Sequence, residues 1–184
     1  MNSLKNSLLI SVPHMNDDIF KNSVIYICEH NLDGAMGLII NKPTDDISYV
    51  NQKNPQHTSS DYFENLKMKL YFGGPVLVEK IIVLHTNELS IGSTIILNDK
   101  ISISSGEEIL GDIEKDKNFN YKLFYGHCGW TAGQLEAEIE NGDWLLQSSK
   151  IDLLFNLPAE KIWKNSIKSL GVNVIDISNM SGRA

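Results

Sequence analysis

Short apolar runs alternate with clusters of turn-forming residues along most of the chain. Runs rich in Val, Ile and Tyr that are bounded by Asn, Asp, Gly or Pro are typical of β-strands. The pattern predicts a first strand at Ser7–Val12, which ends at Pro13, and a hairpin at Ser23–Asn41. The strands of that hairpin are Ser23–Glu29 and Ala35–Asn41, joined by the turn-forming segment HNLDG.

Further apolar runs extend this β-rich pattern through the second half of the chain. The segment LYFGGPVLVEKIIVLH holds two strand-like runs that flank Gly73, Gly74 and Pro75. STIILN and ISIS predict a hairpin around Asn98 and Asp99, and YKLFYG predicts a strand that ends in the turn HCGW. The segment VNVIDIS predicts a final strand.

Helical patterns are fewer and scattered. Ser105–Lys115 is predicted to be a helix, because Ser105 with Glu108 three residues later fits a capping box. Weaker helical candidates lie at Ile47–Asn51 and Tyr62–Met68, and the polar segment NQKNPQHTSSD between them is expected to be a surface loop.

Another helix is predicted after a second capping box, formed by Thr131 with Gln134. Leu135 and Ile139 lie four residues apart and share one face of this helix, which ends at Asn141. The glutamates of the helix are expected to face elsewhere: Glu136, Glu138 and Glu140.

A last helix is predicted to begin at Pro158 and to end at Gly171, because proline suits a first helical turn and glycine suits the position after a helix end. Its apolar residues recur on one side: Ile162, Trp163, Ile167 and Leu170. The strands come in pairs and the helices are scattered between them. We therefore predict an α+β protein with a largely antiparallel sheet, in a single domain that spans residues 1–184.

Charge and composition narrow the class of function. The 184 residues carry a net charge of −7, and Arg183 is the only arginine. A negative field repels phosphate backbones, so direct nucleic-acid binding is disfavoured. The chain shows no apolar run long enough for a membrane span and no N-terminal targeting signal. We expect a cytoplasmic protein, without a membrane partner, whose Cys28 and Cys128 are reduced.

Candidate chemistry gathers at the end of the first hairpin strand. Cys28 and His30 are two apart, so both are expected to point to one face of a strand while Glu29 points to the other. A Cys beside a His can form a thiolate–imidazolium pair. The alternative is a small buried Cys and a His that bonds to the turn. We expect the alternative, with Cys28 a mostly buried, unreactive thiol.

A metal site and an anion site are the other chemical hypotheses. Cys28, His30, His127 and Cys128 supply two thiols and two imidazoles, but their spacing does not fit a compact zinc module. Neither a metal nor a cofactor is therefore expected. The segment Gly73–Pro75 lacks the lysine and threonine of a phosphate-binding loop, so a tight bend is expected there.

Two further residues are ambiguous between core and site. His85 closes a predicted strand and is either a satisfied core residue or part of a site. Trp130 precedes a predicted helix and is expected to pack over its start.

Several segments together resemble a known family. From about Leu8 to Gly171 the chain resembles the YqgE/AlgH family of bacterial proteins. The segments that carry the resemblance are, in order, SVIYICEHNLDGAMGLIINKP, FGGPV with VLH, GHCGWTAGQLEAEI, and DLLF with IW. The chain departs from the family pattern at His127 and Cys128, which weakens any mechanism that requires those two. The residues that match the family motifs are Cys28, Glu29, His30, Gly34, Ala35, Gly37, Asn41, Lys42, Pro43, Gly73, Gly74, Pro75, His85, Trp130, Gly133, Gln134 and Glu136.

The resemblance implies an α+β fold with coiled, bifurcated β-sheets and flanking helices. It also implies a link to a transcriptional regulator proposed for alginate production, but no catalytic residues. We therefore expect a cytosolic protein that binds a small ligand or a protein partner, with an indirect regulatory role. The alternatives are an enzyme that uses Cys28 as nucleophile and His30 as base, and a direct DNA-binding regulator.

Motif residues at strand ends and tight turns are expected to form one ligand cleft, because folds usually place sites there. The turn at His30, the bend at Gly73–Pro75 and the helix start at Trp130 are expected to be neighbours. The candidate cleft residues are Cys28, Glu29, His30, Asn41, Lys42, Gly73, Gly74, His85, Trp130 and Gln134.

Overall fold

The computed structural model describes residues 3–44, 69–88, 94–105, 113 and 119–172. The helices predicted at Ile47–Asn51 and Tyr62–Met68, with the loop between them, lie outside these residues. So do most of the predicted helix Ser105–Lys115 and all of the predicted final strand except Val172. Ser105 itself is described as the last residue of a strand, and the rest of its predicted capping box lies outside the described residues.

The strands are β1 (Ser7–Ser11), β2 (Val24–Asn31), β3 (Gly34–Ile39), β4 (Pro43–Thr44), β5 (Leu70–Phe72), β6 (Val76–Thr86), β7 (Ile95–Ile96), β8 (Ile101–Ser105), β9 (Tyr121–Thr131) and β10 (Trp144–Ser148). The helical elements are α4 (Gln134–Glu140), the π-helix η1 (Asp152–Asn156) and α5 (Ala159–Ser169).

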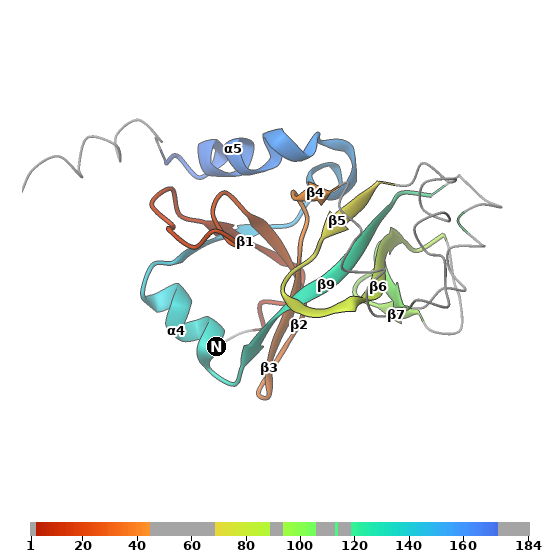
Figure 1. The fold of residues 1–184 in the computed structure, drawn as a ribbon, viewed down its shortest axis with the longest axis horizontal. Coiled ribbons are helices and arrows are strands. Elements are labelled where there is room, and N and C mark those ends of the chain that lie inside the picture. The colour runs from red at the N-terminus through yellow and green to blue at the C-terminus, as the bar shows by residue number, and fades with distance from the viewer. Residues whose placement is uncertain (1–2, 45–68, 89–93, 106–112, 114–118, 173–184) are drawn as a thin grey trace, which may run out of the picture.

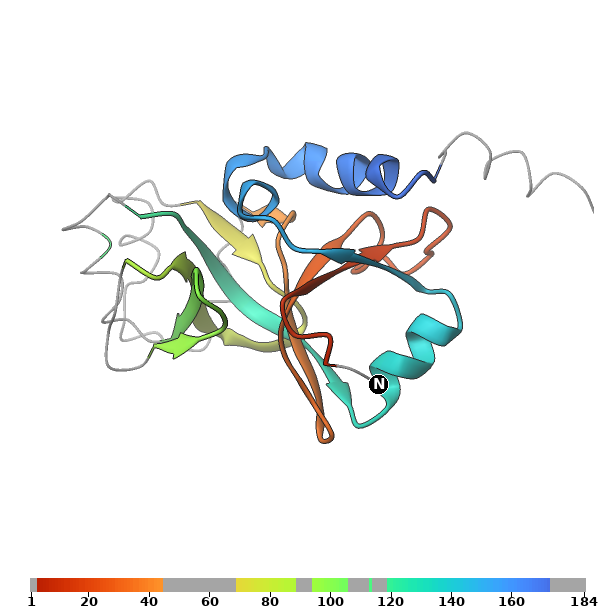
Figure 2. The ribbon, with the colours of Figure 1, turned by 180° about the vertical axis from the view of Figure 1, so that it is seen from behind.

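The strands form a curled half-barrel sheet, ordered β10-β1-β2-β3-β9-β6-β8-β7, with β4 and β5 beside this path (Figure 1 and Figure 2). The described pairings are antiparallel except that of β5 with β9. Strand β9 organises the sheet, because it pairs with β5 and β6 in its first half and with β3 in its second half. The expected α+β fold with a largely antiparallel sheet agrees with this arrangement.

The first predicted hairpin is confirmed. Strands β2 and β3 pair antiparallel from Ile25 with Ile39 to Asn31 with Gly34. The register shifts between Ile27 and Glu29, which marks a β-bulge in β2.

The turn expected at residues 127–130 is wrong. Strand β9 continues from Tyr121 to Thr131, and Cys128 pairs with Gly37 of β3. Gly126 has a φ of 67° in the middle of β9, close to where the strand changes partners. That left-handed angle, which glycine adopts without strain, bends the strand and does not end it.

Helices α4 and α5 follow the predictions, with one difference. The Thr131 N–H donates to Oε1 of Gln134 at 3.1 Å, which is one half of the expected capping box. Pro158 precedes α5, and Gly171 follows it with a φ of 75°. Leu170 was expected on the apolar face of α5, but its side chain is exposed. The apolar residues that α5 does bury there are Ile162, Trp163 and Ile167.

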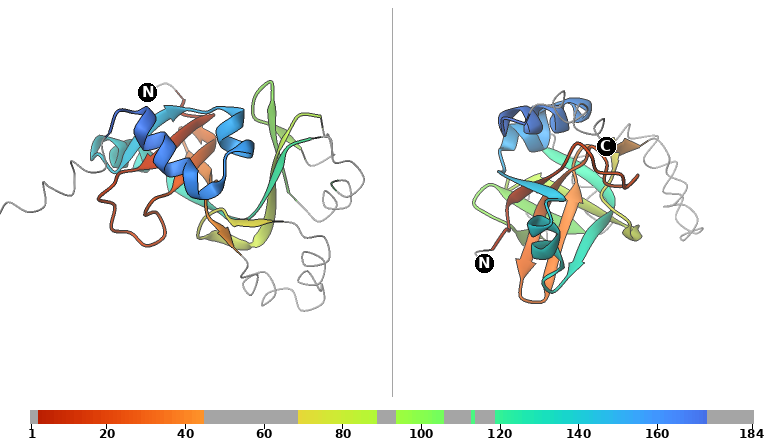
Figure 3. Two further views of the ribbon diagram at one scale, coloured as in Figure 1. Left: turned by 90° about the horizontal axis from the view of Figure 1, so that it is seen from above. Right: turned by 90° about the vertical axis from the view of Figure 1, so that its left-hand side faces the viewer.

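The sheet is buried on both faces around β1 and β2, with a different helix on each face (Figure 3). We call one side the α5 face. Its cluster contains Leu8, Ile10, Val24, Tyr26 and Cys28 with Leu154 of η1 and Ile162, Trp163 and Ile167 of α5. The other side is the α4 face. Its cluster contains Leu9, Ile25, Ile27, Ala35, Cys128, Trp130 and Trp144 with Leu135 of α4.

Candidate functional site

Cys28 and His30 lie on opposite faces, because the bulge after Ile27 interrupts the alternation of β2. Cys28 packs in the cluster of the α5 face. His30 pairs with Ala35, which belongs to the α4 face. The expectation that Cys28 and His30 share one face is therefore wrong. This geometry gives no support to an enzyme that uses the two residues as nucleophile and base.

His30 is held at both ring nitrogens. The Leu4 N–H donates to Nδ1 at 2.9 Å, so Nδ1 carries no proton, and Nε2–H donates to Oε1 of Glu136 at 3.0 Å. The Glu136 carboxyl has a lowered pKa, chiefly because of its own backbone N–H and also because of the His30 hydrogen bond. His30 thus ties the N-terminal residues and α4 to the hairpin, while the neighbouring Glu29 is exposed and bonds to Asn31.

Both thiols are buried. Cys28 is 2% exposed and Cys128 is 1% exposed, and burial raises the pKa of each thiol. A thiol that stays protonated is a weak nucleophile. The expected burial of Cys28 is confirmed. In the part of the chain that the structure describes, no three Cys, His, Asp or Glu side chains are grouped as metal ligands would be.

Trp130 packs over α4, as expected, and the residue that holds it there is Glu138. Oε2 of Glu138 accepts hydrogen bonds from the indole N–H of Trp130 at 2.8 Å and from that of Trp144 at 2.9 Å. Oε1 accepts from Nε2 of Gln134 at 2.9 Å. One carboxylate therefore joins β9, α4 and β10. The expectation that Glu138 faces elsewhere is wrong.

The bend at Gly73–Pro75 packs against β3 and β9. The Gly73 carbonyl accepts from the Ile39 N–H at 2.9 Å, and its N–H donates to the Tyr125 carbonyl at 2.9 Å. A Cβ on Gly73 or Gly74 would collide with the backbone of β9. The bend thus packs against β3 and β9, the two strands that carry Ala35, which pairs with His30, and Trp130. The glycines are needed because the backbone of the bend lies so close to the backbone of β9.

Asn41 and Lys42 anchor the loop between β1 and β2. The Asn41 side chain accepts from the Val24 N–H and donates to the Asn22 carbonyl, each at 2.8 Å. The Lys42 ammonium donates to the Ile19 carbonyl, and burial lowers its pKa. Their polar groups therefore serve the fold.

His85 lies far from Trp130. It pairs with Tyr121 at the start of β9, whereas Trp130 lies nine residues further along that strand, about 30 Å for an extended chain. The ring is fully buried and bonds at 2.9 Å to Oγ of Ser104 and to the Thr86 carbonyl. Burial lowers its pKa. His85 is a satisfied core residue.

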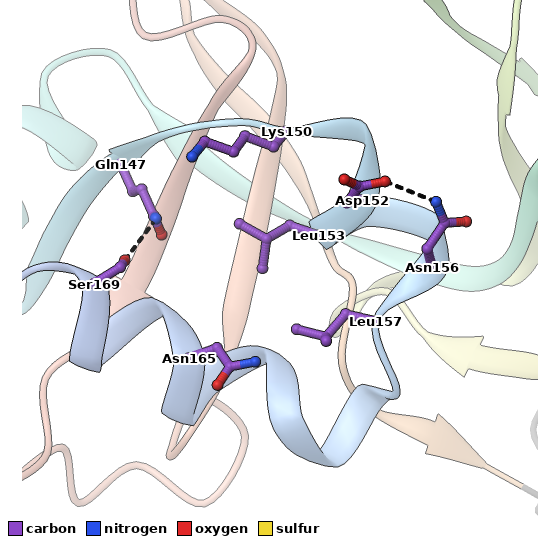
Figure 4. Close-up of a pocket in the computed structure, with 8 residues that line it drawn as sticks. All are labelled: Gln147, Lys150, Asp152, Leu153, Asn156, Leu157, Asn165 and Ser169. Carbon is purple, nitrogen blue, oxygen red and sulfur yellow. Dashed lines mark hydrogen bonds between the residues drawn. The ribbon is translucent and has the colours of Figure 1, made fainter.

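A pocket of about 330 Å³ opens on the α5 face, between β10, η1 and α5 (Figure 4). Leu153 and Leu157 point into it and give it an apolar floor. The lining residues are Gln147, Lys150, Asp152, Leu153, Asn156, Leu157, Asn165 and Ser169.

Gln147 contributes an acceptor with no partner. Its Nε2 donates to Oγ of Ser169 at 2.9 Å, and that hydroxyl donates to the Ser166 carbonyl at 2.8 Å. This chain fixes the orientation of the amide, because the Ser169 proton is already used. Oε1 of Gln147 is left buried, with no hydrogen-bond partner among the described residues.

Some of the other polar side chains of the pocket are hydrogen-bonded to each other, and some are not. Nδ2 of Asn156 donates to Oδ1 of Asp152 at 2.8 Å, so these two satisfy each other. The side chains of Lys150 and Asn165 form no hydrogen bond or ion pair with a described residue. The pocket therefore presents a free ammonium and a free amide above an apolar floor, and the unpaired acceptor of Gln147 is buried in its wall.

A family model described as AlgH-like matches residues 8–175 of this sequence. The chain belongs to the AlgH-like family. It is 36% identical to UPF0301 proteins of Pectobacterium atrosepticum and Vibrio cholerae, over 99% of this chain and 100% of each relative.

Solved structures agree with the fold of this AlgH-like chain. The solution structure of the AlgH protein from Pseudomonas aeruginosa matches with a TM-score of 0.76 and 34% identity, over 100% of this chain and 95% of that one. A crystal structure from Corynebacterium diphtheriae matches with a TM-score of 0.68 and 22% identity, over 92% of this chain and 87% of that one, and shows the fold alone. No helix in the described part of the AlgH-like chain is long and apolar enough to cross a membrane.

The sequence of this AlgH-like chain does not predict the pocket. Its residues come from three elements, and Gln147 and Ser169 are 22 positions apart. The one sequence signal for it is the segment DLLF, which matches a family motif but carries no recognisable site chemistry. In the structure that segment forms most of η1 and lines the pocket.

Proposed function

We propose that this AlgH-like protein is a cytoplasmic ligand-binding protein whose small ligand occupies the pocket between β10, η1 and α5. The unpaired, buried Oε1 of Gln147 carries the proposal. A buried acceptor without a donor costs about 1–3 kcal/mol, and native proteins contain few of them. A ligand N–H or O–H would remove that cost.

The size and the local backbone support the same function. A volume of about 330 Å³ suits a metabolite-sized ligand. Helix η1 has π-helical hydrogen bonding. Such segments are rare and are frequent at functional sites.

A regulatory role of this protein is proposed to be indirect. The net charge of −7 with a single arginine opposes contact with a phosphate backbone. The ligand-bound state would act on other proteins through the surface of α5 and η1, and DNA would not be touched.

The test is a ligand screen followed by amide NMR. The screen contains amino acids, their amides and short carboxylic acids, and hits are mapped by the shifts of backbone amides in β10, η1 and α5. Asn165→Trp places an aromatic ring in the pocket from an exposed position of α5 and is expected to abolish these shifts. Lys164→Trp, on the same helix but not in the pocket lining, is the matched control. Hits that bind Asn165→Trp unchanged would refute the proposed site.

A protein partner at β7 is a second candidate. Ile95 and Ile96 are 63% and 67% exposed, and β7 is the last strand in the sheet order. An edge strand with exposed apolar side chains can pair with another chain. Cross-linking that is lost in Ile96→Lys and retained in Leu32→Lys, a change at the exposed hairpin tip, would support this candidate.

A further inference from the structure

We infer that the ligand of this pocket is a small monocarboxylate that carries a hydrogen-bond donor and a short branched apolar chain. The inference rests on the proposed function and goes beyond it by naming the chemical class. Three features of the pocket select the three parts of the ligand: a free ammonium, an unpaired acceptor and an apolar floor.

Lys150 selects the negative charge. It is the only Lys or Arg among the described residues that line the pocket, and its ammonium forms no ion pair with any of them. Charge-assisted hydrogen bonds between an ammonium and a carboxylate are about twice as strong as neutral ones. The anionic end of the ligand therefore binds at Lys150.

Gln147 selects the donor. Its Oε1 accepts only, and its Nε2 is already bonded to Ser169. A ligand amide N–H or hydroxyl that displaces the groups covering Oε1 can bond to it, whereas an ether or ester oxygen in its place would leave two acceptors facing each other. Gln147 and Lys150 line the same pocket, and the proposed ligand carries its donor and its carboxylate at one end so that it meets both.

Asp152 limits the ligand to one negative charge. It lines the pocket together with Lys150, so the described lining holds one cation and one anion. A phosphate dianion would meet Asp152 without a second cation to compensate. Leu153 and Leu157 then accept an apolar group of a few carbons. An N-acylated amino acid with an aliphatic side chain has all these parts.

The experiment compares four probes by amide NMR titration of the full chain. N-acetyl-L-leucine has every part, N-acetyl-L-leucinamide lacks the charge, 4-methylpentanoate lacks the donor, and isoamylamine reverses the charge. We expect N-acetyl-L-leucine to bind about tenfold more tightly than each of the others. All shifts are expected at β10, η1 and α5.

Variants assign each part to its residue. Lys150→Met is expected to weaken N-acetyl-L-leucine about tenfold while leaving N-acetyl-L-leucinamide unchanged. Gln147→Met is expected to weaken N-acetyl-L-leucine and to leave 4-methylpentanoate unchanged. Lys164→Met, a loss of the same charge on exposed α5 outside the pocket lining, is the control and is expected to change neither.

The two possible failures are distinguishable. Equal affinity of the charged and amidated probes at the pocket, or an unchanged affinity in Lys150→Met, would overturn the ligand class while the pocket remained a binding site. Tighter binding of isoamylamine there would do the same. If no probe and no compound of the wider screen moves the pocket amides, both the class and the proposed function are wrong.

Discussion

Gln134 and Gln147 show how differently the two faces of the sheet use their polar side chains. Gln134 accepts from the Thr131 N–H and donates to Glu138, so both ends of its amide are bonded. Gln147 donates to Ser169, and its oxygen has no partner among the described residues. The amide on the α4 face is hydrogen-bonded at both its nitrogen and its oxygen, whereas the amide beside the pocket on the α5 face is bonded only at its nitrogen.

The difference separates residues that hold this fold from residues that are available to a ligand. On the α4 face His30, Trp130 and Glu138 are typical of sites by residue type, yet their side chains are hydrogen-bonded to groups of the fold itself. On the α5 face Lys150 and Asn165 are ordinary surface residue types, and their side chains have no partner among the described residues. Hydrogen-bond satisfaction is therefore a better guide to this site than residue type.

The largest expected effect concerns the thiol in the hairpin. In Cys128→Ser, which leaves one thiol, we expect Cys28 to react with a labelling reagent on the order of a thousandfold more slowly in the folded than in the unfolded protein. The reason is burial, which both blocks access and raises the thiol pKa. The measurement is labelling rate against pH, with and without denaturant. Fast labelling near neutral pH that disappears in His30→Ala would contradict this prediction and support a reactive Cys28 activated by His30.

Removing the carboxylate that closes the α4 face is expected to destabilise the protein strongly. Glu138→Ala leaves the indole N–H groups of Trp130 and Trp144 without their acceptor. We expect the free energy of unfolding to fall by about 3 kcal/mol. The measurement is urea unfolding. Glu140→Ala, an exposed position on the same helix, is the control and is expected to change stability by less than about 0.5 kcal/mol.

The two glutamines are expected to respond differently to the same change. Gln134→Met breaks the helix cap and the bond to Glu138 and is expected to cost about 1 kcal/mol. Gln147→Met loses one hydrogen bond but also removes the unpaired buried acceptor, so stability is expected to stay within about 0.5 kcal/mol or to rise. Urea unfolding of both variants checks this. A larger loss in Gln147→Met than in Gln134→Met would break the contrast between the faces.

The smallest expected effect is a pH dependence at the edge of the α4 face. The pKa of Glu136 is lowered in the folded protein from an ordinary value of about 4.5, so its ionised form favours the folded state. That contribution is complete above the unfolded pKa and is lost as the pH falls through the lower folded pKa. Glu136→Gln is expected to be slightly less stable than the parent at neutral pH and equal to it in stronger acid. Unfolding curves between neutral pH and about pH 3, with Glu140→Gln as control, measure this. A difference that grows in acid would contradict the assignment.

Local patterns in the sequence predicted much of the fold. The apolar runs around HNLDG predicted the hairpin, and Pro158 with Gly171 predicted the limits of α5. The bulge between Ile27 and Glu29 was not predictable from alternation, because a bulge is defined by the register with the partner strand. That single extra residue reversed the expected side of His30.

The sequence predicted the candidate site less well, because a site depends on distant pairs. Glu138 reaches Trp130 and Trp144 through space, and a helical pattern alone shows it only as one of three glutamates on a polar face. The unpaired acceptor of the pocket depends on Gln147 bonding to Ser169 through its nitrogen alone. Whether a polar group is satisfied becomes visible only once both partners have been placed.

The contrast between the two glutamines can be measured directly from their side-chain amide signals in a proton–nitrogen NMR spectrum. N-acetyl-L-leucine is added to the folded protein, and the Gln134 and Gln147 side-chain signals, assigned with Gln134→Met and Gln147→Met, are followed to saturation. We predict that the Gln147 signals move as its oxygen gains a donor and that the Gln134 signals stay fixed. Movement of Gln134 with Gln147 unchanged would place the binding on the α4 face and contradict the account.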